Sequence, residues 1–147
     1  MAQTGGYAIG HFNVSTLEFC QAVIEAANEL QAPVIVAASV SALEHAGIEQ
    51  LFLNVSSLAR NVPIPVALHL DHGPDVSWAK TCIEQGWTSV MIDSSKFDFS
   101  SNVRITRQVV DLAHRKKVSV EAELGRLKGI EDMVKVKDRD ASLTDPK

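Results

Sequence analysis

The run His69-Leu70-Asp71-His72 is the densest group of chemically reactive side chains in the sequence. In a β-strand, His69 and Asp71 would lie on one face, because successive side chains point to opposite sides. His72 follows where Gly73-Pro74 ends the strand. An imidazole beside a carboxylate can bind a metal ion and transfer a proton. The alternative is that a histidine at a strand end only hydrogen-bonds to neighbouring backbone.

Carboxylates follow the next two apolar runs along the chain. Asp93 comes directly after residues 88–92, and Glu121 and Glu123 lie at the end of residues 118–123. One imidazole nitrogen with several carboxylate oxygens is a ligand set that suits zinc or another divalent ion. Two alternatives stay open, namely Asp93 as the cap of a turn before Ser94 and the two glutamates on an exposed edge strand.

The elements that must position these residues alternate between short apolar runs and helical patterns. The apolar runs start about every 23 to 32 residues, which is the length of a βαβ unit. The pattern therefore predicts an α/β fold with a parallel sheet. Strands are expected at residues 7–14, 34–38, 65–70, 88–92 and 118–123, and helices at residues 15–27, 48–60, 75–85 and 100–112.

Each expected strand has a polar residue at its carboxyl end. In a parallel α/β barrel, catalytic groups gather at that end, so the sequence predicts one shared functional edge. The residues are Asn13, Ser39, Asp71, Asp93 and Glu123. Beyond them, residues 125–147 are polar and charged and are expected to form a long loop. Three further histidines have no potential ligand or catalytic partner at a recognisable spacing, and we expect them to be surface or structural residues. They are His11, His45 and His114.

Composition limits the class of protein. The chain has 147 residues, of which 46% are hydrophobic and 22% charged, so we expect one ordinary globular domain. The net charge of −4 argues against binding to nucleic acid or to anionic membranes. No apolar run reaches the ~20 residues of a membrane helix, and no signal-peptide pattern opens the chain. Cys20 and Cys82 are expected to be buried free thiols, which is consistent with a cytoplasmic location.

Four ordered blocks of the sequence carry a family resemblance. They resemble the class II, zinc-dependent fructose-bisphosphate aldolases, including the relatives that cleave tagatose bisphosphate. This resemblance implies a (β/α)8 TIM barrel and a homo-oligomer, either a dimer or a tetramer. The blocks are YAIGHFNV at residues 7–14, HLDHG at 69–73, TSVMIDSS at 88–95, and VSVEAELG at 118–125 with GIED at 129–132.

The resemblance also implies a cation site. His72 is expected to be a ligand of the catalytic zinc ion. Asp93 and Glu123 are expected to be metal ligands at a second or alternative position, for a divalent or monovalent cation. Lys96 stands where family members often have a histidine, and it would place a positive charge near Asp93. His11 stands where they often have a small residue.

Roles in substrate binding and proton transfer follow from the same resemblance. Asp71 is expected to be the acid/base that handles the aldol hydroxyl group, and Glu131 the loop carboxylate that removes a proton from the three-carbon ketone phosphate. Asn13 and Ser39 are expected to contact the substrate. The implied reaction is the reversible aldol cleavage of fructose 1,6-bisphosphate to dihydroxyacetone phosphate and glyceraldehyde 3-phosphate, through a zinc-stabilised enediolate. None of the five expected strands contains a lysine, which argues against a Schiff-base mechanism.

The chain departs from the family pattern in its extent. The family uses two further zinc-binding histidines and later phosphate-binding loops, and residues 1–147 contain neither. We therefore expect residues 1–147 to be an incomplete barrel domain of about five βα units, whose activity requires the missing carboxyl-terminal part. The alternatives are a tagatose 1,6-bisphosphate aldolase and a non-catalytic half-barrel subunit that pairs with a complementary chain.

Overall fold

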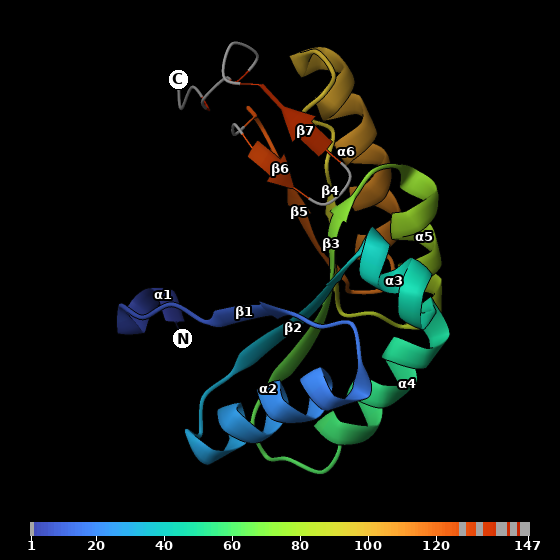
Figure 1. Ribbon diagram of the computed structural model, residues 1–147. Coiled ribbons are helices and arrows are strands. Elements are labelled where there is room, and N and C mark those ends of the chain that lie inside the picture. Colours follow the sequence, from blue (N-terminus) through green and yellow to red (C-terminus); the bar gives the residue numbers. More distant parts are fainter. Residues whose placement is uncertain (1, 127–128, 132–133, 138–140, 142–143, 145–147) are drawn as a thin grey trace.

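A computed structural model describes residues 2–126, 129–131, 134–137, 141 and 144. Its main feature is a five-stranded sheet in the order β1-β2-β3-β4-β5, in which every neighbouring pair is parallel (Figure 1). The strands are β1 (Gly10–Asn13), β2 (Val34–Ser39), β3 (Val66–Gly73), β4 (Ser89–Ile92) and β5 (Ser119–Ala122). The predicted α/β fold with a parallel sheet is confirmed.

Helices α2 to α6 follow the strands and cover one face of the sheet, whereas the short helix α1 precedes β1 and lies apart from that layer (Figure 1). The helices are α1 (Ala2–Gly5), α2 (Leu17–Glu29), α3 (Val40–Ala46), α4 (Ile48–Ala59), α5 (Val76–Gln85) and α6 (Phe99–His114). Asp75 caps α5, because its carboxylate accepts hydrogen bonds from the backbone N–H groups of Ser77 and Trp78 at 2.8 and 3.1 Å. Gly86 ends the same helix in the left-handed conformation, with φ of 104°. Both ends of this helix agree with the sequence expectation.

Other boundaries differ from those expected. The helix expected from residue 15 starts after Thr16, which caps it, and the helix expected from residue 100 starts after Asp98, which caps it. In each case the side-chain oxygen accepts a hydrogen bond from the backbone N–H three residues on, which fixes the start of the helix. The sequence also missed α3, because seven residues with Val40 and Leu43 buried are too few to establish a helical period.

The charged segment after β5 also contains structure that the sequence did not predict. β6 (Gly129–Glu131) and β7 (Val134–Val136) pair as a two-stranded antiparallel sheet within the expected long loop. The expectation of a structureless loop over residues 125–147 was therefore wrong for this part. Three-residue strands are too short to show the alternating pattern from which strands are predicted.

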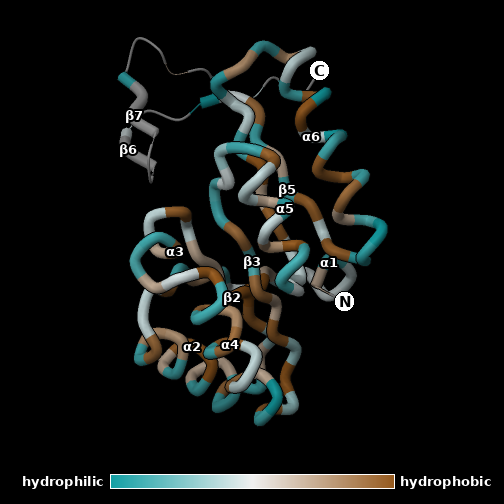
Figure 2. Tube along the Cα trace, turned by 90° about the vertical axis from the view of Figure 1, so that its right-hand side faces the viewer, coloured by the Kyte–Doolittle hydropathy of each residue, from teal (hydrophilic) through white to brown (hydrophobic). Residues whose placement is uncertain are grey.

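The apolar core lies between the sheet and the helices. Val36, Leu70, Val90 and Ile92, which belong to the three central strands, are fully buried. Figure 2 shows hydrophobic (brown) chain around the β3 label. Cys20 and Cys82 are buried free thiols in α2 and α5, as predicted. Burial raises the pKa of Cys82 to about 12, so this thiol stays protonated and unreactive at neutral pH. No helix in the described part of the chain is long and apolar enough to cross a membrane.

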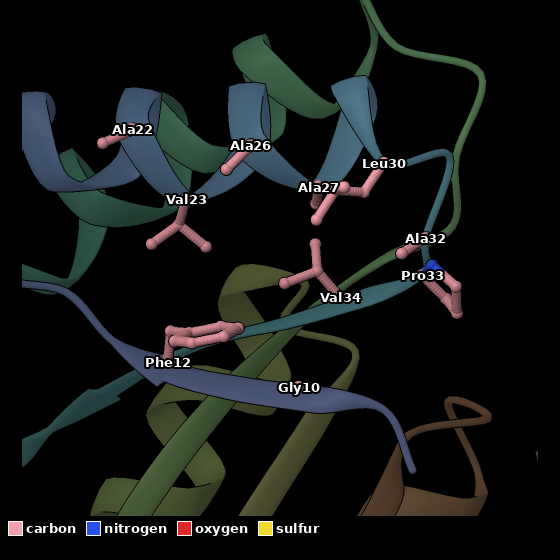
Figure 3. Close-up of a pocket in the computed structure, with 10 residues that line it drawn as sticks. All are labelled: Gly10, Phe12, Ala22, Val23, Ala26, Ala27, Leu30, Ala32, Pro33 and Val34. Carbon is pink, nitrogen blue, oxygen red and sulfur yellow. The ribbon is translucent and has the colours of Figure 1, made fainter. Parts of the chain in front are cut away.

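An apolar pocket of about 400 Å³ lies at the β1 edge of the sheet, between α2 and the first two strands (Figure 3). Phe12 from β1, Val23 from α2 and Val34 from β2 point into it, and Leu30 closes one end (Figure 3). Its lining carries no acid, base or metal ligand. It is therefore a packing surface rather than a chemical site.

Candidate metal centre

The polar residues predicted at the carboxyl ends of the strands include a group that lies close together in the structure. Asn13, at the end of β1, donates a hydrogen bond from Nδ2 to Oδ2 of Asp71 on β3 at 2.8 Å. Ser39, at the end of β2, lies opposite Asp71 in the strand register. The structure thus brings Asn13, Ser39 and Asp71 together, although they are 26 to 58 residues apart in sequence. Parallel strands meet at their carboxyl ends, which is the physical reason.

The end of β3 departs from regular strand geometry. Its register with β4 shifts between Leu70 and Gly73, and His72 has φ of +48°, in the left-handed region. A bulge of this kind turns a side chain away from the direction that strict alternation would give it. Asp71 and His72 are adjacent in sequence, yet the first contacts β1 and the second contacts groups that follow β4 and β5.

Gly73 is required by this bulge. A Cβ atom there would lie 2.6 Å from the backbone oxygen of Met91 and 2.9 Å from a side-chain carbon of Leu70. The Gly73 carbonyl also accepts a hydrogen bond from the backbone N–H of Asp93 at 2.8 Å. The close approach of β3 to β4 therefore places Asp93 next to His72.

His72, Asp93 and Glu123 form the predicted group of possible metal ligands. Nδ1 of His72 lies 3.3 Å from Oδ2 of Asp93 and 3.5 Å from Oε2 of Glu123. One ligand atom from each residue lies within 4.8 Å of the other two. The side chains are 21%, 8% and 19% exposed, so the group is shielded but open to a small ion. One nitrogen and two carboxylate oxygens fit a divalent cation.

Electrostatics at this group show how strongly its charges interact. The hydrogen bond to Asp93 is the main reason that the pKa of His72 rises to about 9, and burial opposes that rise. The same contact lowers the pKa of Asp93 to about 2, with help from Ser95, whose backbone N–H donates to Oδ1 at 3.0 Å. Without a metal ion, the His72 ring is therefore protonated and carries one positive charge beside the carboxylates of Asp93 and Glu123. A metal ion must displace that proton to bind.

Asn102 supports the group in a way that sequence reasoning missed. This residue lies in the first turns of α6 and is 6% exposed. Its Nδ2 donates a hydrogen bond to the backbone oxygen of Glu123 at 2.8 Å. Asn102 thereby fixes the chain just beyond β5, where Glu123 turns toward His72. The sequence carries no signal for this contact, because the burial of Asn102 follows only from the packing of α6.

A second cluster lies deeper along the same face of the sheet. His69 is 2% exposed, and its Nδ1 lies 2.8 Å from Oγ of Ser89 on β4. Its Nε2 lies 3.5 Å from Oε2 of Glu121 on β5. Burial is the main cause that lowers the pKa of His69, so the ring is neutral at neutral pH. The ring of His11 on β1 packs edge-on against His69, with centroids 5.2 Å apart. Sequence spacing did not predict this partner for His11.

The remaining expectations concern Lys96, Glu121 and Glu131. The Lys96 ammonium lies 5.2 Å from the centre of the Phe97 ring. Burial opposes the lowering of the pKa of Asp75, which hydrogen bonds from Ser77 and Trp78 cause, with a smaller contribution from the charge of Lys96. Glu121 is mostly exposed on β5, the edge strand of the described sheet, yet it reaches His69. Glu131 ends β6, and its side chain lies outside the part of the chain that the structure describes. Its predicted role therefore stays a prediction.

Comparison with known sequences identifies the family. A parallel α/β fold with polar residues gathered at the carboxyl ends of its strands is typical of α/β-barrel proteins. Residues 1–147 match the family model described as class-II fructose-bisphosphate aldolase, and the chain belongs to that family. A fructose-bisphosphate aldolase from Thermus caldophilus is 48% identical over 145 residues, which are 99% of this chain and 47% of that protein. One from Helicobacter pylori is 44% identical over 147 residues, which are 99% of this chain and 48% of that protein.

Solved structures agree with this assignment. A crystal structure from Coccidioides immitis, described as that of a putative fructose-1,6-bisphosphate aldolase, superimposes with a TM-score of 0.87 at 33% identity, over 99% of this chain and 51% of that one. The YdjI aldolase of Escherichia coli has a TM-score of 0.80 at 37% identity, over 84% of this chain and 48% of that one. The fold is therefore the first part of a TIM barrel, as predicted. The chain spans about half the length of the relatives it matches.

Proposed function

We propose that this chain forms the first five βα units, an incomplete domain at residues 1–147, of a class II aldolase. The full-length protein would cleave fructose 1,6-bisphosphate reversibly to dihydroxyacetone phosphate and glyceraldehyde 3-phosphate. The observation that carries the proposal is the side-by-side placement of two groups at the strand ends. One is the ligand group of His72, Asp93 and Glu123, and the other is the Asn13–Asp71 hydrogen bond.

The metal centre is assigned to the first group. His72 would hold zinc together with two histidines from outside this chain, and Asp93 and Glu123 would serve a second or alternative cation position. When bound, the ion supplies positive charge that stabilises the negative charge developing on the ketone oxygens as the carbon–carbon bond breaks. The charged imidazole between two carboxylates supports this assignment, because the site already attracts a cation at that point.

Proton transfer is assigned to two carboxylates. Asp71 takes the proton of the aldol hydroxyl group in the cleavage direction and returns it in the condensation direction. The Asn13 amide holds one oxygen of this carboxylate, which fixes its orientation. Glu131 would exchange the proton on the carbon of the three-carbon ketone phosphate, from a segment that closes over the site.

Further parts of the proposal concern partners and location. Asn13 and Ser39 would also contact the ketose bisphosphate or triose phosphates, since they flank Asp71. We propose that the full-length protein is a cytoplasmic homo-oligomer, a dimer or a tetramer. It would bind neither nucleic acid nor membranes, in keeping with its net charge of −4.

Turnover of the full-length protein tests the proposal. With fructose 1,6-bisphosphate, activity should be abolished by EDTA and restored by zinc. The variant Asp71→Asn should lose roughly 10²- to 10⁴-fold in kcat, the usual contribution of a general acid/base. Asp111→Asn, an exposed residue in a surface ion pair with Arg107, is the matched control and should retain activity. Full turnover in EDTA, or in the Asp71→Asn variant, would refute the assignment.

The same assay separates the alternatives. Tagatose 1,6-bisphosphate differs in configuration at the carbon whose hydroxyl group Asp71 would deprotonate, so the two sugars are compared under identical conditions. Faster turnover of the tagatose sugar would make the protein a tagatose-bisphosphate aldolase. A full-length protein that neither binds metal nor cleaves either sugar would support the non-catalytic half-barrel subunit.

A further inference from the structure

His11, His69 and Asp71 form a second group of potential metal ligands, separate from the proposed metal centre. One ligand atom from each residue lies within 4.8 Å of the other two. His69 precedes Asp71 by two residues on β3, so its side chain lies on the same face but deeper in the fold. We propose that these three residues, with Glu121 beside them, bind a second divalent transition-metal ion such as Zn²⁺.

The buried ring of His69 is the first observation that supports this site. Its Nε2 is buried and has no hydrogen-bond partner among the described residues. Oε2 of Glu121 lies 3.5 Å from this nitrogen, which is too far for a normal hydrogen bond. A buried nitrogen without a partner is unfavourable, and a metal ion between this nitrogen and the carboxylates would satisfy it.

The partner of the other ring nitrogen is the second observation. Nδ1 of His69 lies 2.8 Å from Oγ of Ser89. If Nδ1 carries the proton and donates it to this hydroxyl group, the lone pair remains on Nε2, the buried nitrogen that lies 3.5 Å from Oε2 of Glu121. Histidine ligands of metals are commonly held in this way, by a hydrogen bond from the second ring nitrogen.

The ligand types define the kind of ion. Two imidazoles and one or two carboxylates suit Zn²⁺, Co²⁺, Ni²⁺ or Cu²⁺, whereas Mg²⁺ and Ca²⁺ prefer oxygen ligands alone. The edge-on packing of His11 against His69, with ring planes at 76°, brings the second imidazole to the site. His11, His69 and Glu121 come from the first, third and fifth strands, which are the alternate strands whose side chains share one layer inside a barrel.

An ion at this site would have a consequence for activity. Asp71 belongs to both groups, so coordination would take up the carboxylate to which proton transfer was assigned. Excess metal should therefore inhibit the enzyme, and this consequence rests on the proposed function. The binding of the ion itself does not rest on it.

Metal stoichiometry tests the site independently of catalysis. The full-length protein is stripped with a chelator, re-equilibrated with Zn²⁺, and its metal content is measured by mass spectrometry. We expect His11→Ala to bind one zinc ion fewer per chain than the wild type. His114→Ala, which removes an exposed histidine from the last turn of α6, should bind as many as the wild type. Equal zinc content in His11→Ala and wild type would overturn the proposal.

A cobalt experiment locates the second ion. In the variant His72→Ala, which removes the proposed catalytic ligand, Co²⁺ should still bind and give a visible absorption band. That band should disappear in the double variant His72→Ala/His11→Ala, and its persistence there would refute the site. The outcomes are distinguishable from those of the proposed function. Loss of the second site alone leaves EDTA-sensitive turnover intact, whereas failure of the aldolase proposal leaves the His11-dependent ion in place.

Discussion

His72 is the residue at which charge, backbone conformation and proposed chemistry meet. Its left-handed backbone is unfavourable for a residue with a Cβ atom, and the bulge next to Gly73 imposes it. In return, Nδ1 lies within 3.5 Å of carboxylates that follow two different strands. A side chain held in this way presents a ligand nitrogen to a cation in a fixed position. Such backbone strain beside a candidate site fits a functional role for the bulge.

The pH dependence of stability should reveal the His72–Asp93 pair in the metal-free protein. The folded-state pKa of His72 is raised from 6.5 to about 9, so the pair stabilises the fold fully below pH 6.5 and this is lost as pH rises toward 9. On the acid side, the pKa of Asp93 is lowered from 3.8 to about 2, so its contribution is lost as pH falls through that range. Urea unfolding of the EDTA-treated full-length protein and of His72→Gln measures the effect.

The expected result is a difference in unfolding free energy on the order of 2 kcal/mol at pH 6 that shrinks toward zero by pH 9.5. The variant Lys80→Gln, which removes an exposed i,i+4 ion pair with Glu84, is the control and should show a small difference throughout. A His72→Gln effect that does not change with pH would contradict the charge pairing.

Among individual residues, sequence patterns predicted those that share a short motif or that end a strand. His72, Asp93 and Glu123 were predicted in this way, and the structure brings them together. His11 and Asn102 were not predicted, because each acts through a contact about 20 to 60 residues away that leaves no local pattern. These contacts depend on the register of the strands and on the way the elements pack, which only the three-dimensional structure shows.

The contact between β3 and β4 is the element on which the site depends most. Gly73→Ala should shift β3 away from the Met91 backbone oxygen, because the new methyl group has only 2.6 Å of space. We expect a loss of roughly 1–3 kcal/mol in unfolding free energy, typical of overpacking, together with weaker zinc binding. Thermal unfolding and zinc titration of the full-length protein measure the two effects.

Gly5→Ala provides the matched control for this change. Its new methyl group would meet the exposed ring of Tyr7, which can rotate away, so stability should change little. Unchanged stability and zinc affinity in Gly73→Ala would show that the bulge does not hold the site.

Helix α6 is expected to position Glu123 through Asn102. Replacing Asn102 with Ala leaves the Glu123 carbonyl without its buried donor, which typically lowers stability by about 1–3 kcal/mol. Because supporting hydrogen bonds tune metal ligands, we also expect the affinity for a cation at the Asp93–Glu123 position to fall roughly 10- to 100-fold. The control Ser100→Ala changes an exposed residue two positions earlier and should leave affinity unaltered. A competition titration with a chromogenic chelator compares the variants, and equal affinities would argue against the positioning role.

The order of elements was largely predictable, whereas their ends were not. Strand and helix types followed from apolar spacing, since β2, β3 and β4 are buried and nearly continuous apolar runs. The missed helix α3 and the β6–β7 hairpin are both too short to produce a period. Several neighbouring polar residues could cap a helix, and the sequence does not show which of them accepts the hydrogen bond. At α2 it is Thr16, next to Ser15, that accepts from the backbone N–H of Phe19.

The whole molecule is best understood as half of a closed barrel. In the described chain, the sheet ends at β1 and β5, and the apolar pocket beside β1 leaves Phe12 and Leu30 51% and 78% exposed. Unpaired parallel edges and apolar grooves of this kind favour association. The relatives to which this chain is similar are about twice as long as the chain.

Residues 1–147 expressed alone should therefore self-associate and lack aldolase activity. Size-exclusion chromatography with light scattering should give large or mixed species, and zinc-supplemented assays should give no turnover. Adding the carboxyl-terminal part, either fused or co-expressed, should give a uniform oligomer with activity. A monodisperse monomer of residues 1–147 with family-level turnover would contradict the half-barrel account.

The central claim is that a divalent metal ion binds at His72, where the ends of β3, β4 and β5 meet. Anomalous diffraction at the zinc edge, from crystals of the zinc-loaded full-length protein, tests it most directly. The account predicts an anomalous peak at about 2.1 Å from a ring nitrogen of His72. A zinc-loaded, active crystal with no peak within bonding distance of either ring nitrogen of His72 would contradict it.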